Sequence, residues 1–259
     1  MKYLITALIL GAGLGPVSAQ QDSTAADTVK KEKKVSVEVT LGTDKDEKKK
    51  SSSDFFVGFT LSRFDIGFSR YLDNGSFTLS PQTDILEFEG WKTHNIGFEF
   101  FQMGYRFNPN FKVYIAGGLD WTHIRLKKNI SFQKDQPELT YIDEDIDFKK
   151  NRFSSQYLRI PLSFQLRTNN DKKDKRFYFV AGPEAGFLLA GKQKQVSDER
   201  GKVKTKDDFN FAPFRYGGFV RMGYSNIGLY TKFYFNDVFA ENQGPADFKN
   251  IVFGLTFGF

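Results

Sequence analysis

The sequence predicts an all-β fold, an eight-stranded antiparallel transmembrane up-and-down β-barrel, and three observations lead to it. Eight segments alternate with a period of two, which is typical of strands whose two faces meet unlike environments. One row of each segment is apolar, whereas the other row carries charged residues and many glycines. The connections between the segments are short and long in strict alternation, as in membrane barrels.

The eight segments are separated by polar connections of two kinds. The segments are Phe55–Ser62, Thr93–Phe107, Lys112–Leu126, Tyr157–Arg167, Arg176–Ala190, Phe214–Tyr224, Ile227–Asn236 and Asn250–Phe259. The short connections, rich in turn formers, are Asn108–Asn110, Thr168–Lys175 and Ser225–Asn226. The long ones are Arg63–Lys92, Lys127–Gln156, Gly191–Pro213 and Asp237–Lys249. Short turns lie in the periplasm and long loops outside the cell, so both ends of the barrel are expected in the periplasm.

The strand count has one ambiguity near the start of the barrel. Asp65–Tyr71 and Ser76–Ser80 flank Asp73-Asn74-Gly75, which is a hairpin signal. These segments either extend the first strands above the membrane or form two further barrel strands, which would give ten.

The chain before residue 54 does not show the pattern of barrel strands. Lys2 and the short apolar run Tyr3–Leu14 precede small residues, so residues 1–19 are predicted to be a signal peptide cleaved near Ala19. Residues 20–53 are polar and rich in Lys, Asp and Ser, and we expect a disordered periplasmic arm with one alternating patch, Val35–Leu41. The barrel is predicted for residues 54–259. There is no cysteine, so no disulfide can form.

The segment Tyr157–Arg167 indicates which face meets lipid. Leu158 and Ile160 belong to its apolar row, whereas Arg159 belongs to the other row. An Arg facing lipid at the middle of the bilayer costs about 2–4 kcal/mol, so the charges are expected to point inward. A soluble barrel such as a lipocalin would invert this arrangement and would need a full solvent surface outside. The many glycines of the polar row favour a narrow interior instead.

The inward charges are predicted to form a belt of ion pairs that is structural. The set is Glu99, Asp120, Arg159, Glu184, Arg215, Arg221 and Lys232. Side chains just fill an eight-stranded interior, so a diffusive pore is not expected and buried charges must neutralise one another. Simple hairpin register puts Arg159 near both Asp120 and Glu184. A proton or ion path through the belt is the functional alternative.

Aromatic residues fall near the predicted strand ends, as in the girdles of membrane barrels. Trp91 and Trp121 lie toward the outer end, and Tyr105, Tyr224 and Phe259 lie toward the periplasmic end. Any β-protein with 17% aromatic residues would also place some of them there.

The sequence shows no catalytic motif, and we predict no catalytic residue, no metal and no cofactor. His94 and His123 are expected to be outward-facing neighbours at the outer interface, although a metal pair or a Ser-His-acid arrangement formed in space is the alternative. The run Asp143–Asp145 is expected to be a solvated loop, because it lacks the ordered spacing of a calcium loop.

The formal charge of +6 sits largely in lysine-rich segments. An exported chain does not meet nucleic acid, so that partner is excluded by the predicted signal peptide. The runs Lys127–Lys128, Lys149–Lys150 and Lys202–Lys206 can contact the phosphates of lipopolysaccharide, with ordinary solvation of loop tips as the alternative.

The last segment resembles the closing strand of bacterial outer-membrane β-barrels. Its apolar row ends in Phe257 and Phe259. The resemblance implies that these two residues are part of the signal read by the barrel-assembly machinery.

Further stretches resemble a Bacteroidota-type family of small outer-membrane barrels, of the PorT type and similar to OmpA and OmpX barrels. They are Tyr157–Leu162, Phe179–Gly186, Pro213–Tyr224 and Tyr230–Phe239 followed by Gly244-Pro245. The resemblance implies a protein of the bacterial outer membrane. We expect a monomer in contact with outer-membrane lipids, lipopolysaccharide, the barrel-assembly machinery and envelope proteins. We expect a non-enzymatic structural, adhesive or accessory envelope role. The alternatives are a PorT-like accessory of a protein secretion apparatus and a lipid-modifying enzyme.

Overall fold

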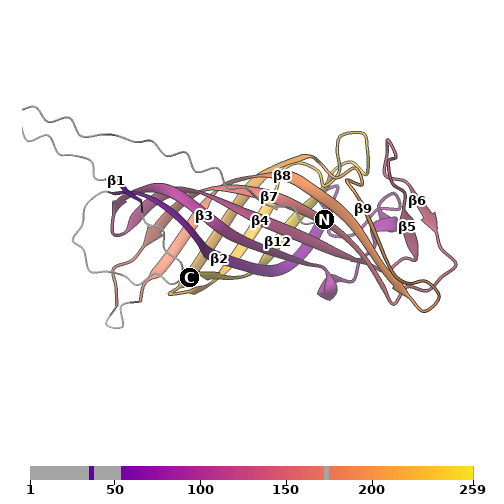
Figure 1. The fold of residues 1–259 in the computed structure, drawn as a ribbon, viewed down its shortest axis with the longest axis horizontal. Coiled ribbons are helices and arrows are strands. Elements are labelled where there is room, and N and C mark those ends of the chain that lie inside the picture. Colours follow the sequence, from indigo (N-terminus) through magenta and orange to yellow (C-terminus); the bar gives the residue numbers. More distant parts are fainter. Residues whose placement is uncertain (1–34, 38–53, 172–174, 259) are drawn as a thin grey trace, which may run out of the picture. The chain divides into compact units, whose positions relative to one another are not determined.

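The computed structural model describes residues 35–37, 54–171 and 175–258, and within them eight long antiparallel strands close a ring (Figure 1). The strands are β2 (Asp54–Asp73), β3 (His94–Asn108), β4 (Phe111–Leu126), β7 (Lys150–Arg167), β8 (Phe177–Ser197), β10 (Phe214–Tyr224), β11 (Ile227–Tyr234) and β12 (Phe248–Gly258). Each pairs with the next ring strand in the chain, and β12 returns to pair with β2. The predicted eight-stranded barrel is therefore confirmed. Phe259, the predicted signal peptide and most of the predicted arm lie outside the described residues.

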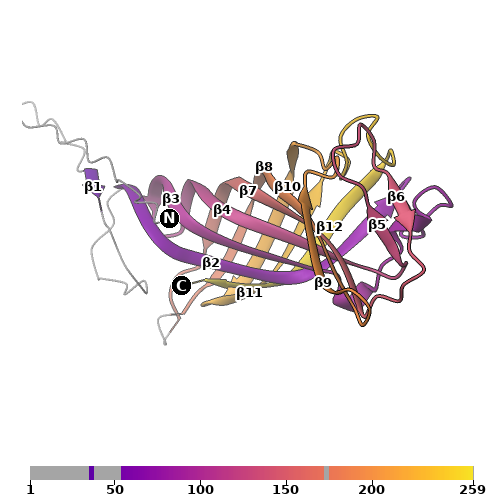
Figure 2. The ribbon, with the colours of Figure 1, turned by 45° about the vertical axis from the view of Figure 1, so that its right-hand side comes forward.

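The shorter elements lie at the two ends of the ring. They are β1 (Val35–Val37), β5 (Ile130–Phe132), β6 (Tyr141–Asp143), β9 (Gly201–Asp207) and the single 3-10 turns η1 (Asp84–Leu86) and η2 (Gly90–Lys92). β1 pairs in parallel with the start of β2. β9 pairs with residues 191–197 at the end of β8, and the two strands form a hairpin. Figure 2 shows β5, β6 and β9 beyond the end of the ring that carries the long connections. No helix in the described part of the chain is long and apolar enough to cross a membrane.

The short connections form tight turns, as their composition predicts. The Asn108 side chain accepts hydrogen bonds from the backbone N–H groups of Asn110 and Phe111, both at 2.9 Å. Between β10 and β11, Ser225 has a φ of 56°, which closes a two-residue hairpin. Local side-chain and backbone geometry thus fixes the register at this end of the ring.

The first barrel strand differs from the prediction. We expected it to end at Ser62, but β2 continues to Asp73. A register irregularity between Phe59 and Arg63 places two extra residues in β2 relative to β3. At the same level β3 has one extra residue relative to β4, between Glu99 and Phe101, so the alternation changes in both strands. The outward row of β2 changes from odd to even residue numbers, and Asp65 faces inward. An irregularity that shifts the alternation by one residue moves every later side chain to the other face, which a simple alternation count does not follow.

The two further barrel strands of the ten-stranded alternative do not form. The predicted turn does form, with Asn74 and Gly75 at φ values of 49° and 77°. The residues after it form no barrel strand, because they fold back onto the carboxylate of Asp73. That carboxylate accepts hydrogen bonds from the Ser80 backbone N–H at 2.5 Å and from the Thr83 hydroxyl at 2.6 Å.

Besides Arg63–Lys92, two further predicted long loops are largely or partly strand. β7 already begins at Lys150, inside the expected loop Lys127–Gln156. β8 continues to Ser197, and β9 follows it, so most of the expected loop Gly191–Pro213 is a hairpin. The wall of the ring therefore extends well beyond the predicted segments at one end.

Side-chain polarity inverts along this extended wall, and β4 shows the change most clearly. In the lower part of β4, which begins at the short turn, the outward row is apolar, with Ile115 exposed, while the inward Asp120 is fully buried. In its upper part, which leads into a long connection, the inward Ile124 and Leu126 are buried, and the outward row becomes polar from His123 on. We call the lower part, with its apolar outward row, the apolar zone.

We call the upper part, with its loops, the cap. It has a hydrophobic core of its own. The buried members of this core are Tyr71, Leu86, Ile124, Leu126, Ile130, Phe132, Phe153, Phe209, Phe211, Phe239 and Phe248. They come from barrel strands and from the loops above them. The cap therefore has apolar side chains inside, like a water-soluble domain. The apolar zone has the opposite arrangement, with charged side chains inside and apolar ones outside.

Candidate functional site

Charged side chains fill the interior of the apolar zone. They are Arg63, Asp65, Glu99, Asp120, Arg159, Glu184, Arg215, Arg221 and Lys232, which we call the lumen belt, and none is more than 7% exposed. The structure places all seven residues of the predicted belt on this inward face. Sequence reasoning missed Arg63 and Asp65, because the irregularity in β2 reverses the alternation before them.

Two arginines share two carboxylates at the centre of the belt. Arg159 Nη1 lies 2.8 Å from Asp65 Oδ2, and Arg159 Nη2 lies 2.9 Å from Glu99 Oε1. Arg221 Nη2 reaches the same two oxygen atoms at 2.9 and 2.8 Å. Four strands, β2, β3, β7 and β10, are thereby joined across the interior. Charge-assisted bonds of this kind are the strong ones when they are shielded from water.

Asp120 forms the second centre of the belt. It accepts hydrogen bonds from Arg215 Nη2 and Lys232 Nζ, both at 2.5 Å, and from Asn95 Nδ2 at 2.9 Å. Arg159 Nη1 is 3.7 Å from Asp120 Oδ1, so this residue links the two centres. A carboxylate with three such donors is well compensated for its loss of water.

Glu184 lies in the belt diagonally from Arg159, near it as hairpin counting suggested, but the two form no direct ion pair. The β7–β8 register sets Arg159 opposite Gly186 and Glu184 opposite Pro161. Glu184 instead accepts a hydrogen bond from the Tyr234 hydroxyl at 2.7 Å.

Arg215 is held between two aromatic rings. Its guanidinium carbon lies 3.8 Å from the ring centre of Tyr157 and 4.1 Å from that of Tyr234. Guanidinium groups stack favourably on aromatic faces, more so away from water. Glycine makes room for the long side chain, because a Cβ atom at Gly186 would lie 2.9 Å from Arg215 Cγ.

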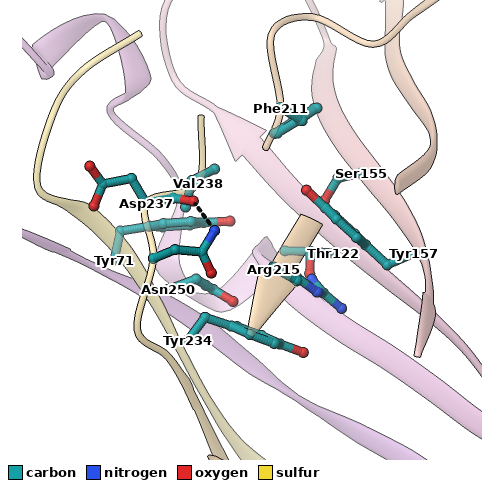
Figure 3. Close-up of a pocket in the computed structure, with 11 residues that line it drawn as sticks. Tyr71, Thr122, Ser155, Tyr157, Phe211, Arg215, Tyr234, Asp237, Val238 and Asn250 are labelled. Atoms are coloured by element: carbon teal, nitrogen blue, oxygen red, sulfur yellow. Dashed lines mark hydrogen bonds between the residues drawn. The ribbon is translucent and has the colours of Figure 1, made fainter. Parts of the chain in front are cut away.

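A small cavity lies between the lumen belt and the cap (Figure 3). It has a volume of about 20 Å³, and Tyr157, Arg215 and Tyr234 line its belt side. Phe211 and Val238 line it from the cap loops. A space of this volume holds about one water molecule, not a solute. Between the belt and the cap, the interior is therefore filled almost entirely by side chains.

Acidic residues of the cap loops are engaged with neighbours. Glu144, in the run considered for calcium, accepts a hydrogen bond from Ser131 at 2.5 Å and lies 2.8 Å from Arg200 Nη1. The bond from Ser131 is the largest influence on the pKa of Glu144, which is lowered from its ordinary value. No group of three or more potential metal ligands occurs within residues 35–37, 54–171 and 175–258.

The two histidines are neighbours on the outward face where the cap begins. His94 is directly opposite His123, with ring centres 5.0 Å apart. His123 Nδ1 lies 2.8 Å from the hydroxyl of Ser154. Among the described residues, no carboxylate forms a hydrogen bond with either imidazole. This is a hydroxyl–imidazole pair without the acid that completes a triad.

The predicted girdle residues lie at both ends of the apolar zone. At the cap side, Trp91 in η2 is 82% exposed and packs edge-on against Phe68, while Trp121 on β4 packs against Phe98. At the turn side, Tyr105 contacts Phe107 and Tyr224 contacts Phe177. Phe257 lies on β12 with Ile227 opposite it, and its role in assembly stays a prediction.

Comparison with known proteins gives a family and distant structural likenesses. Residues 19–240 match the family described as outer membrane protein beta-barrel domain. No curated protein matches this chain. A solved structure similar to it is Ail, the attachment invasion locus protein of Yersinia pestis, in complex with the heparin analogue sucrose octasulfate. The identity is 14%, the coverage is 80% of this chain and 96% of that one, and the TM-score is 0.32, so nothing about function follows from it.

The family match spans most of the chain and agrees with the geometry. A ring of eight strands has lipid-compatible side chains outside and neutralised charges inside. The chain therefore belongs to the outer membrane protein β-barrel domain family, and its place is the bacterial outer membrane.

Proposed function

We propose that this protein is a closed membrane anchor whose working part is the cap, with a non-enzymatic structural, adhesive or accessory role at the cell surface. The observation that carries the proposal is the contrast between a filled interior and a cap with its own core. The lumen belt ties its strands together by buried ion pairs, so the interior serves stability and not passage. The cap, in contrast, has a hydrophobic core of its own that combines strand and loop residues.

The cap presents structured rather than loose surface. The β8–β9 hairpin stands above the ring, and the β5–β6 hairpin packs beside it through Gln193 and Gln195, which donate hydrogen bonds to the Ile130 carbonyl at 2.9 and 3.0 Å. Long loops of membrane barrels are extracellular. Ordered loops on a rigid scaffold are where binding functions are usually found.

A deletion strain tests this proposal together with purified protein. Loss of the chain should reduce attachment or envelope integrity, and the wild-type gene should restore it. A variant whose β5–β6 connection, residues 133–140, is replaced by a Gly-Ser linker should reach the membrane and fail to restore it. In planar bilayers the purified chain should give no conductance steps. Steady ion current through the wild-type protein would contradict the closed-anchor proposal.

The two alternatives have separate readouts in the same experiments. The contact between Ser154 and His123 is the observation that favours a lipid-modifying enzyme. That alternative predicts release of fatty acid from labelled lipid A or phospholipid, abolished by Ser154→Ala and by His123→Ala. The resembling stretches alone favour the PorT-like accessory role. This role predicts that the deletion strain loses protein export, and that any change in attachment follows from the lost export.

A further inference from the structure

Seven cationic side chains lie together on the outward face of β7, β8 and β9. They are Lys150, Arg152, Lys192, Lys194, Lys202, Lys204 and Lys206, which we call the basic strip. Strand register places Arg152, Lys194 and Lys204 in one cross-strand row. Lys192 and Lys206 form the neighbouring pair, and Lys150 and Lys202 flank Val196 in the next row. Side chains opposite one another on adjacent strands are about 5 Å apart at Cβ, and like charges there are destabilising.

The basic strip has no carboxylate to neutralise it within the described residues. Three other lysines of the cap are paired: Lys127 Nζ lies 2.6 Å from Glu87 Oε1, Lys128 contacts Asp84, and Lys149 contacts Asp198. No member of the strip forms such a pair with a residue that the structure describes. Arg152 is partly buried, and its Nε has no hydrogen-bond partner there.

The like charges of the strip act on one another. Burial and then the charges of Lys204 and Lys206 lower the pKa of Lys192 from its ordinary value. The neighbouring Lys202 is the first cause of the lowered pKa of Lys194. Lys192 and Lys194 are therefore easier to deprotonate than free lysines, because the like charges of the strip repel one another. An anion in contact with the strip would relieve this repulsion.

The strip lies directly above the apolar zone, on the side wall of the ring. The row Trp121, Gln156 and Ala190 is followed, two residues further up each strand, by His123, Ser154 and Lys192. Two residues of a strand rise about 7 Å, less when the strand is tilted. Lipid headgroups extend about 5–8 Å beyond the hydrocarbon core on each side of a bilayer. The strip therefore faces sideways, at the level of headgroups in the outer leaflet, and not upward to the medium.

We infer that the basic strip is a binding site for the phosphate groups of lipopolysaccharide in the surrounding outer leaflet. Phosphates of neighbouring lipid molecules supply the anions that the strip lacks, and the apolar row below contacts their acyl chains. A strip along three adjacent strands can engage more than one phosphate. This site fixes the depth of the barrel and the orientation of the β8–β9 hairpin above the membrane. The inference does not depend on which role the cap performs.

Lipid binding by two matched triple variants of the full folded chain tests the site. The strip variant is Arg152→Gln, Lys194→Gln and Lys204→Gln, and the control is Lys127→Gln, Lys128→Gln and Lys149→Gln, which removes the same charge. The probe is bisphosphorylated lipid A in phosphatidylcholine nanodiscs. Each basic residue near an anionic surface contributes about 1 kcal/mol, so the strip variant should bind about a hundredfold more weakly. The control should stay within about threefold, because its lysines are already paired.

Three further arms make the outcome decisive. Heat-modifiable migration in gels verifies that both variants are folded. Lipid A that lacks one phosphate should bind the wild-type chain more weakly, and added salt should reduce the difference between the two variants. Equal losses in the strip and control variants would overturn the site, since net charge alone would then explain binding. Strip-dependent binding of a soluble sulphated glycan, equal to that of lipid A, would overturn the assignment to membrane phosphates.

Discussion

The apolar zone and the cap share the same strands, but the polarity of their inward and outward side chains is opposite. Within the apolar zone, ion pairs such as Arg159–Glu99 are buried and apolar side chains face out. Within the cap, Phe153 is buried and cations face out. The change occurs within a few residues of Trp121 on β4. One continuous strand can therefore serve two solvents, because only the alternation of side chains, and not the backbone pairing, has to change.

The two regions are held together by different forces, and single substitutions can separate them. In the apolar zone the outside lipid offers no hydrophobic driving force, so buried polar contacts and backbone pairing must supply the specificity. In the cap, water surrounds the wall, so apolar burial is again the main stabilising term.

Replacing Arg159 by Gln should cause one of the largest losses of stability. Asp65 and Glu99 would each lose an ion pair in a fully buried site, and breaking a buried pair typically costs about 3–5 kcal/mol. Guanidinium unfolding in detergent micelles measures the free energy of unfolding. Arg152→Gln, on the same strand but in the basic strip, is the matched control and should change it by less than about 0.5 kcal/mol. Equal effects of the two changes would mean that the lumen belt does not support the ring.

Replacing Phe153 by Ala should cause a similar loss, about 3–5 kcal/mol, confined to the cap. Phe153 is fully buried, with ring centres of Phe132 and Phe211 at 4.4 and 4.7 Å. The cap should become sensitive to protease while the ring stays folded and heat-modifiable. Phe164→Ala, on the outward face of the apolar zone, should leave the cap resistant. A ring that unfolds together with the cap would show that the two regions are one cooperative unit.

Two exposed apolar residues give a sharper comparison, since their exposed fractions are almost equal. Ile160 in the apolar zone is 37% exposed, and Val203 on β9 is 39% exposed. Ile160→Lys would place a charge against lipid and should cost about 2–4 kcal/mol if the residue lies near mid-bilayer. Val203→Lys should cost less than about 0.5 kcal/mol, because its surroundings are water. Folding titrations into lipid vesicles measure both, and equal costs would contradict the division into two zones.

The smallest expected effect concerns Asp73 and the loop after β2. Burial acts to raise the pKa of Asp73, but hydrogen bonds from Thr83 and Ser80 outweigh it, so the pKa lies below its ordinary value. The ionised carboxylate therefore stabilises the loop at any pH above the unfolded value, and this contribution is lost as the pH falls through the lowered value. Asp73→Asn should remove about 1–2 kcal/mol of loop stability at neutral pH. Amide exchange of residues 74–83 measures it, and the difference from wild type should vanish in strong acid.

The sequence predicts the number of ring strands, the alternation of short and long connections and the inward position of the charges. Those features follow from a period of two and from turn chemistry, and both can be seen in short stretches of neighbouring residues. The extra residues in β2 are not local in that sense, since they depend on pairing with β3. Two apolar rows of opposite parity, one ending at Leu61 and one beginning at Phe64, were the available signal.

The partners within the lumen belt were harder to predict than its members. Counting from turns placed Glu184 and Asp120 near Arg159, but it did not find Asp65 on β2, which Arg159 reaches across the interior. Long side chains in a closed ring contact strands far away in the chain, so adjacent register does not decide their partners. The cap was missed for a related reason: its core combines strand residues such as Ile124 with loop residues such as Phe209.

Single cysteines along the outward row of β4, each carrying a nitroxide spin label, test the polarity inversion most directly. The chain contains no cysteine of its own, so each label reports one position. In lipid vesicles, labels at Ile115 and Leu119 should be reached by oxygen dissolved in the bilayer. Labels at His123 and Arg125 should be reached by a water-soluble nickel complex, with the crossover at Trp121. Uniform access to either reagent along the whole row would contradict a strand that passes from lipid into water.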